Sequence, residues 1–89
     1  MNLESKPTIP PQVMSRLVGD ETVLLDLASG MYFGVDGVAR TIWESISEGH
    51  SLGEAAAVIA SEYDVDAARA EADVIEFVSK LVERGLLTD

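Results

Sequence analysis

The chain has 89 residues, of which 47% are hydrophobic and 25% are charged, so its composition is that of one small globular domain. Six Lys and Arg residues stand against 16 Asp and Glu, and the net charge of −10 argues against a nucleic-acid or anionic-membrane partner, since both are bound by clustered basic side chains. There is no cysteine, which excludes thiol catalysis, disulfides and thiolate metal centres, and there is one histidine. We expect no catalytic site, no cofactor and no metal.

The first twelve residues contain all three prolines and little apolar mass. We therefore expect residues 1–12 to form a flexible tail and residues 13–89 to form a single domain. The start of the chain lacks the apolar core of a secretory signal peptide, and the longest apolar runs are far below the about 18 residues that span a bilayer. With no signal and no cysteine, the expected compartment is the cytoplasm.

The first half of the chain predicts an antiparallel meander of three β-strands. Residues 13–18 end at the turn pair Gly19-Asp20, and residues 22–28 begin with β-forming side chains. Ser29-Gly30 has the length of a two-residue hairpin loop, and residues 31–35 follow as the third strand.

The expected hairpin pairing distributes apolar side chains over both faces of the sheet. With a loop at Ser29-Gly30, Asp26 opposes Phe33 and Leu24 opposes Val35, and directly opposed residues share a face. The other face carries Val23, Leu25, Leu27, Tyr32 and Gly34. Because a free-standing meander normally has one polar face, either both faces are covered by the protein or one is available to a partner.

The second half predicts three helices. Residues 36–48 have apolar side chains at helical spacing, among them Trp43, which we expect in the core. Ser51 and Glu54 have the spacing of a capping box at the start of a helix over residues 51–63. The apolar stripe of the last helix, residues 66–84, is wider than one buried seam requires.

Three strands followed by three helices make an α+β domain, which is winged-helix-like with the wing strands placed first. In a winged helix, residues 51–63 would be the recognition helix for DNA. This segment contains two Glu and no Lys or Arg. DNA binding is therefore not expected, because neutralisation of phosphates dominates affinity for DNA.

Ser51 carries an alternative function. Gly49-His50-Ser51-Leu52 resembles the phosphopantetheine attachment motif of peptidyl carrier proteins, in which the serine begins a helix. The preceding residues lack the aromatic and paired-glycine lead-in of that family, and a carrier domain is all-helical. A peptidyl-carrier-like protein modified on Ser51 is the second hypothesis.

An ordered set of motifs is similar to a known family. Residues 24–36 read Leu-Leu-Asp-Leu-Ala-Ser-Gly-Met-Tyr-Phe-Gly-Val-Asp, and residues 39–44 read Ala-Arg-Thr-Ile-Trp-Glu. Glu-Tyr-Asp-Val-Asp and a final Leu-Val-Glu-Arg-Gly-Leu-Leu follow. This set resembles the PqqD-like family of peptide chaperones, also called RiPP recognition elements, over about residues 12–87.

The resemblance implies a non-enzymatic adaptor that binds the leader segment of a ribosomally made precursor peptide and presents it to modifying enzymes. The leader would add as a strand to the sheet edge and lie against the last helix. We favour lasso-peptide biosynthesis over PQQ biosynthesis. The implied partners are the precursor leader and a leader peptidase, a cyclase or a radical modifying enzyme. The unpaired edge is compatible with a monomer or a strand-swapped dimer.

Residues 31–35 would form an edge strand, and an unpaired apolar edge is normally a liability unless it is used. We therefore expect leader contacts from this strand and from the last helix, at Met31, Tyr32, Phe33, Gly34, Val35, Asp73, Val74, Phe77, Lys80 and Leu81. For the apolar helix residues in this set, the alternative is packing in the core. For the two charged residues, the alternative is a solvated helix face.

Overall fold

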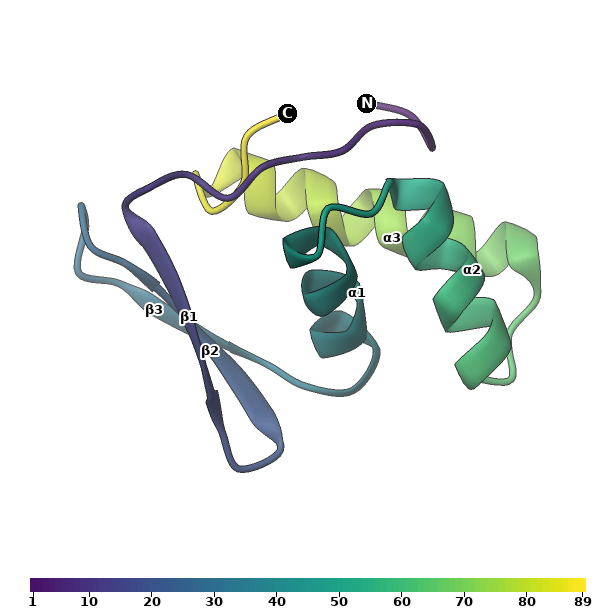
Figure 1. The fold of residues 1–89 in the computed structure, drawn as a ribbon, viewed down its shortest axis with the longest axis horizontal. Coiled ribbons are helices and arrows are strands. Elements are labelled where there is room, and N and C mark those ends of the chain that lie inside the picture. Colours follow the sequence, from purple (N-terminus) through teal and green to yellow (C-terminus); the bar gives the residue numbers. More distant parts are fainter.

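Three antiparallel strands precede three helices in the computed structural model, which describes all of residues 1–89 (Figure 1). The strands are β1 (Val13–Val18), β2 (Glu21–Asp26) and β3 (Tyr32–Val35), and the helices are α1 (Gly37–Ser47), α2 (Leu52–Glu62) and α3 (Ala67–Glu83). The predicted α+β class and element order are confirmed. The strand order is β1-β2-β3, so both β1 and β3 are edges of the sheet.

The loop between β2 and β3 is longer than the two residues expected. Leu24 opposes Phe33, whereas the predicted register paired it with Val35. The Asp26 carboxylate accounts for the difference. It accepts hydrogen bonds from the Ala28 N–H (3.0 Å) and from the Ser29 hydroxyl (3.1 Å), so the loop begins directly after Asp26. A shift of two residues keeps each side chain on its predicted face, since side chains alternate with a period of two.

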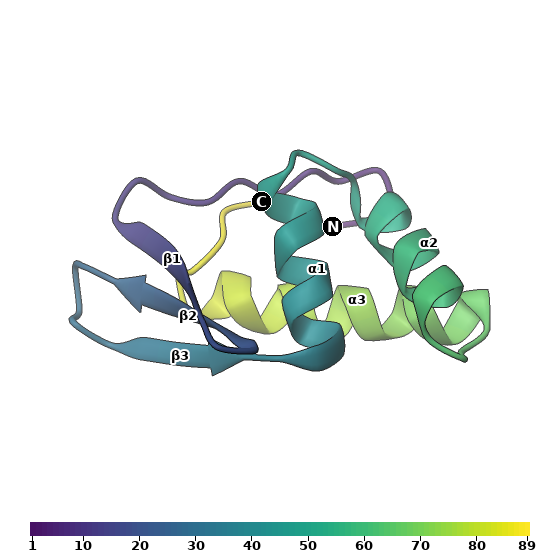
Figure 2. The same ribbon diagram turned by 60° about the horizontal axis from the view of Figure 1, so that its bottom comes forward.

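The two faces of the sheet differ in their surroundings. Leu24 and Val35 lie on the inner face, are 0% and 9% exposed, and belong to the core. Met14, Val18 and Tyr32 lie on the outer face and are 57%, 57% and 73% exposed. Figures 1 and 2 show the helices gathered to one side of the sheet. One of the two predicted apolar faces is therefore packed, and the other is open.

Side-chain caps fix where α2 and α3 begin. The Ser51 hydroxyl accepts a hydrogen bond from the Glu54 N–H (3.1 Å), and the Glu54 carboxylate accepts one from the Ser51 N–H (2.8 Å), which completes the predicted capping box. Asp66 caps α3 in the same way by accepting from the Arg69 N–H (2.8 Å). Asp36 precedes α1 but its side chain makes no capping bond.

The core lies between the inner face of the sheet and the three helices. Trp43 is 1% exposed at its centre, as expected. Leu86 and Leu87 follow α3 and are 0% and 1% exposed, so the chain end returns to the core. None of the three helices combines the length and the apolar content that a membrane span requires.

Residues 1–12 are bonded to the rest of the molecule, which differs from the flexible tail expected. Thr8 and Thr88 exchange two backbone hydrogen bonds of 2.9 Å and form an isolated antiparallel bridge. The carbonyls of Leu3 and Ser5 accept backbone N–H groups from the first turn of α2 (2.7 and 3.0 Å). The segment thus satisfies donors that a helix leaves free at its start, and it lies beside the chain end (Figure 1).

Candidate functional site

The free edge of β3 is the first part of the candidate site. Residues of an antiparallel strand bond to the neighbouring strand alternately. The Asp26 N–H donates to the Met31 carbonyl (2.9 Å), which fixes the alternation, so Phe33 directs its backbone groups to β2. Tyr32 and Gly34 direct their N–H and C=O groups away from the sheet. Their backbone therefore offers donors and acceptors to an added strand.

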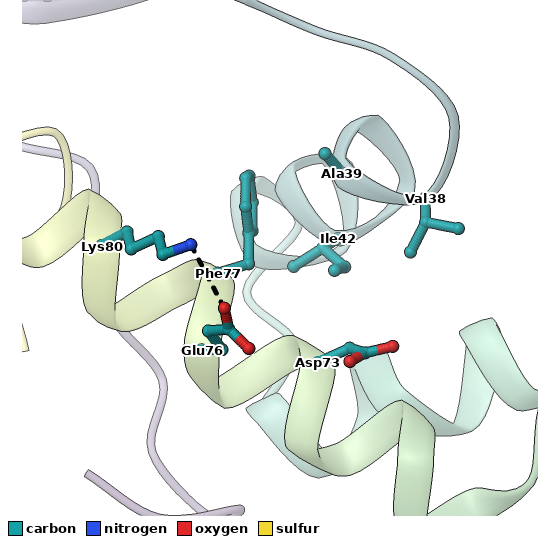
Figure 3. A pocket seen from close by; sticks show the side chains of 7 residues that line it. All are labelled: Val38, Ala39, Ile42, Asp73, Glu76, Phe77 and Lys80. Atoms are coloured by element: carbon teal, nitrogen blue, oxygen red, sulfur yellow. Dashed lines mark ion pairs between the residues drawn. The ribbon is translucent and has the colours of Figure 1, made fainter.

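A groove of about 280 Å³ between α1 and α3 is the second part of the site. We call it the α1–α3 groove, and Figure 3 shows its lining: Val38, Ala39 and Ile42 from α1, and Asp73, Glu76, Phe77 and Lys80 from α3. The α1 side and the phenyl ring are apolar, and the charged groups come from α3. The arrangement suits an apolar side chain held beside charged groups.

The charged groups of the α1–α3 groove are already paired along α3. The Lys80 ammonium lies 3.2 Å from the Glu76 carboxylate, and the Asp73 carboxylate lies 3.5 Å from the Arg69 guanidinium. Both pairs have a spacing of four residues, which places the partners one turn apart on the helix. Because these charges are paired within α3, the apolar lining is the part of the α1–α3 groove that is free to contact a ligand.

The last helix divides the predicted contact residues between two flanks. Asp73, Phe77 and Lys80 lie together in the α1–α3 groove. Val74 and Leu81 are 0% and 6% exposed and belong to the core. This is the core packing given as the alternative for the apolar helix residues, so we expect peptide contacts on this helix from Asp73, Phe77 and Lys80 and not from these two side chains.

The predicted residues of the third strand also divide. Met31 and Tyr32 are 56% and 73% exposed and accessible to a ligand. Phe33 is partly buried against the core, and Val35 is 9% exposed, so its side chain belongs to the core as well. Gly34 supplies backbone at a position covered by the Glu21 side chain, whose carboxyl lies 2.6 Å from where a Cβ would stand.

A second hollow, the loop cavity, lies between the β2–β3 loop and the end of α3. It has a volume of about 380 Å³ and is lined by Asp26, Ser29, Met31, Phe33 and Arg84. Phe77, Lys80 and Arg84 follow one another along α3 at spacings of three and four residues, so they share a flank of the helix. This flank borders the α1–α3 groove in its middle and the loop cavity at its end.

The sequence did not identify the α1 side of the site or Arg84. Val38, Ala39 and Ile42 read as the apolar stripe of an amphipathic helix, and only the packing of α1 against α3 shows which of them line the groove. Arg84 read as a basic residue at the end of a helix, where it interacts favourably with the helix dipole. Its place beside β3 depends on the tertiary fold.

Ser51 has a structural role in the capping box. The three-stranded sheet also differs from the all-helical carrier fold, so the structure gives no support to the carrier-protein alternative. His50 lies 3.8 Å from the Glu54 carboxylate, on the same capped turn. No group of three or more histidine, aspartate or glutamate side chains is placed to hold a metal ion.

Comparison with known proteins identifies the family. The family model for coenzyme PQQ synthesis protein D (PqqD) matches residues 21–87, which is more than half of the chain. The chain belongs to the PqqD family. The predicted resemblance is thereby confirmed, and the matched segment contains β2, β3 and all three helices.

Two solved structures resemble this chain over most of its length. TbiB1 in complex with the TbiA(beta) leader peptide is 39% identical, with a TM-score of 0.86, over 90% of this chain and 93% of that chain. A lasso peptide synthetase B1 complexed with the leader peptide is 29% identical, with a TM-score of 0.89, over 96% of this chain and 100% of that chain. None of the curated proteins matches this chain.

Proposed function

We propose that this protein is a non-enzymatic adaptor that binds the leader segment of a ribosomally made precursor peptide. The main observation in support of the proposal is the free backbone edge of β3 next to the α1–α3 groove. The proposal is supported by 39% identity to TbiB1, whose structure contains a leader peptide. The lasso pathway is favoured over PQQ biosynthesis because the other similar structure is a lasso peptide synthetase B1.

The leader binds as a fourth strand beside β3. Tyr32 and Gly34 exchange backbone hydrogen bonds with it, which provides affinity without regard to sequence. Alternate leader side chains point to the inner face, toward the flank of α3 that carries Phe77 and Lys80. The four residues of β3 span about 13 Å, and α3 advances about 10 Å from Asp73 to Lys80, so strand and helix offer surfaces of similar length.

The adaptor presents the bound leader to the enzymes that process the precursor. In a lasso pathway these are a leader peptidase and a cyclase; a radical modifying enzyme would take their place in PQQ biosynthesis. The free protein is a monomer, or a strand-swapped dimer through the same edge of β3. Such a dimer would compete with the leader, because one strand edge accepts one partner.

The test is a titration of a fluorescein-labelled TbiA(beta) leader peptide, followed by fluorescence polarisation. Tyr32→Pro removes an outward N–H at the first residue of β3, where proline is tolerated in a sheet. Tyr32→Ala is the matched control, because it removes the side chain and keeps the N–H. We expect Tyr32→Pro to weaken binding about tenfold relative to Tyr32→Ala, the value of about one hydrogen bond.

A second probe covers the case in which the leader of this pathway differs from TbiA(beta). A displayed library of random peptides is selected on the wild-type protein, and the enriched peptides are titrated against the same two variants. Peptides that bind wild type and Tyr32→Pro equally would contradict strand addition. Failure of both the TbiA(beta) leader and the library to yield a binder would contradict the proposed function.

A further inference from the structure

Most exposed cations near the candidate site are neutralised by a neighbour on their own helix. Arg40 pairs with Glu44 at 3.0 Å, and on α3 both Arg69 and Lys80 pair with a carboxylate one turn away. Arg84 differs, because no carboxylate oxygen lies within 4.0 Å of its guanidinium. Lys6 and Arg16 also lack a carboxylate partner, but Arg84 is the basic residue without one on the flank of α3 that borders β3.

Arg84 is held in place by an aromatic ring. Its guanidinium carbon lies 5.2 Å from the centre of the Phe33 ring, within the range of a cation–π contact. The contact joins the end of α3 to β3, the two elements of the proposed leader site. A guanidinium that rests on a ring keeps N–H donors in its plane, and these donors match the geometry of a carboxylate.

Asp26 is the acidic residue that shares the loop cavity with Arg84. Its carboxylate is committed to the β2–β3 loop, where it accepts hydrogen bonds from the Ala28 N–H (3.0 Å) and the Ser29 hydroxyl (3.1 Å). The loop cavity thus contains one acid with local partners and one base without an acidic partner. An incoming carboxylate would complete the arrangement.

The register of an added strand places one leader side chain beside Arg84. Phe33 points to the inner face, and a residue directly opposite it on a new strand would have its Cβ about 5 Å away on the same face. The next inner-face side chain of the leader, two residues further along, lies beside Val35. Val35 ends β3 shortly before α1, whose first residues line the α1–α3 groove.

We infer that Arg84 forms a carboxylate subsite in the loop cavity, which selects leader peptides with an Asp or Glu opposite Phe33 and an apolar residue two positions away. This inference rests on the proposed function and adds a side-chain preference to it. The apolar residue anchors the strand in the α1–α3 groove. The acidic residue fixes the register, because a slip of one residue would turn its side chain to the outer face, away from Arg84.

The test compares peptides selected from a random displayed library on wild type, Arg84→Gln and Arg84→Glu. Wild type is expected to enrich Asp or Glu at one position, two residues from an apolar residue. Arg84→Gln should lose the acidic preference and keep the apolar one, and Arg84→Glu should enrich Lys or Arg at the same position. Arg69→Gln is the matched control, because it removes a paired arginine from the same helix and should leave the preference unchanged.

A titration then measures the contact with one selected peptide. Replacing its acidic residue by the corresponding amide should weaken binding to wild type about tenfold and to Arg84→Gln by about twofold at most, since hydrogen bonds to charged groups are stronger than neutral ones. A purely structural role of Arg84, through the helix end or the ring, would change stability and leave the residue preference intact.

The outcomes separate this inference from the proposed function. The same residue frequencies at that position for wild type and Arg84→Glu would overturn the carboxylate subsite while leaving the adaptor function in place. Failure of both the library and the TbiA(beta) leader to bind wild type would overturn the subsite and the adaptor function together. Enriched peptides that bind Tyr32→Pro as well as Tyr32→Ala would overturn strand addition and, with it, the register on which the subsite depends.

Discussion

Phe77→Ala and Val74→Ala form a matched pair that tests how α3 is divided between core and groove. Both side chains were predicted from sequence to contact the leader, and they lie less than one turn apart. Val74 is 0% exposed, whereas Phe77 is partly buried and lines the α1–α3 groove. The structure therefore predicts that Val74→Ala lowers stability more, whereas Phe77→Ala lowers leader affinity more.

The expected magnitudes follow from burial. Val74→Ala removes two buried carbons at about 0.8 kcal/mol each and leaves a small cavity, while the better helix propensity of alanine returns about 0.5 kcal/mol, so the free energy of unfolding should fall by about 2 kcal/mol. Phe77→Ala removes a ring that is only partly buried, and the better helix propensity of alanine returns about 0.5 kcal/mol, so the net loss should be about 1 kcal/mol. Leader affinity should fall at least about tenfold for Phe77→Ala and stay unchanged for folded Val74→Ala.

Two measurements decide the comparison. Urea denaturation is followed by the fluorescence of Trp43, which is 1% exposed and should report unfolding. Fluorescence polarisation of the labelled leader peptide then measures its affinity for each variant in the absence of urea. Unchanged affinity for Phe77→Ala, or a loss of affinity for Val74→Ala while it remains folded, would refute the assignment of the two flanks.

Three further predictions concern the caps and the N-terminal segment. Ser51→Ala should lower the free energy of unfolding by about 1 kcal/mol in urea denaturation and leave leader affinity unchanged. We expect no phosphopantetheine to be added to Ser51, so mass spectra after incubation with a phosphopantetheinyl transferase should show no mass gain for wild type or for this variant. The pKa of Glu54 is lowered, chiefly by the hydrogen bond from the Ser51 backbone N–H. Its contribution to stability is therefore present above the ordinary pKa of a glutamate and lost as pH falls through the lowered value, and Glu54→Gln should flatten that part of a thermal-unfolding pH series. Deletion of residues 1–9 should accelerate hydrogen exchange of the Leu52 and Gly53 amides, which donate to carbonyls of that segment; unchanged exchange would show that these bonds do not protect α2.

Much of the fold could be predicted because local chemistry determines it. Ser51 and Glu54 cap α2 as their spacing indicates, and Asp66 caps α3. The bounds of β1 agree with the prediction residue for residue. The β2–β3 register was wrong by two residues, because the side chain of Asp26 builds a loop that backbone turn rules do not describe.

The site was predictable in part. The β3 edge followed from the order of the strands, and Phe77 followed from the width of its helix stripe. The stripe alone could not separate Phe77 from Val74, because the choice depends on where α1 packs. The bonding of Leu3 to α2 was missed for a related reason: it uses backbone atoms, which every residue has, and so it leaves no pattern in the sequence.

Amide hydrogen exchange of β3, measured by NMR with and without saturating leader peptide, tests the central claim most directly. The Tyr32 and Gly34 N–H groups face the free edge and should exchange rapidly in the free protein. Strand addition predicts that both become protected when the leader binds, while the Ser15 and Leu17 N–H groups on the opposite free edge of β1 do not change. Binding that leaves Tyr32 and Gly34 unprotected, or that protects the β1 edge instead, would contradict the account.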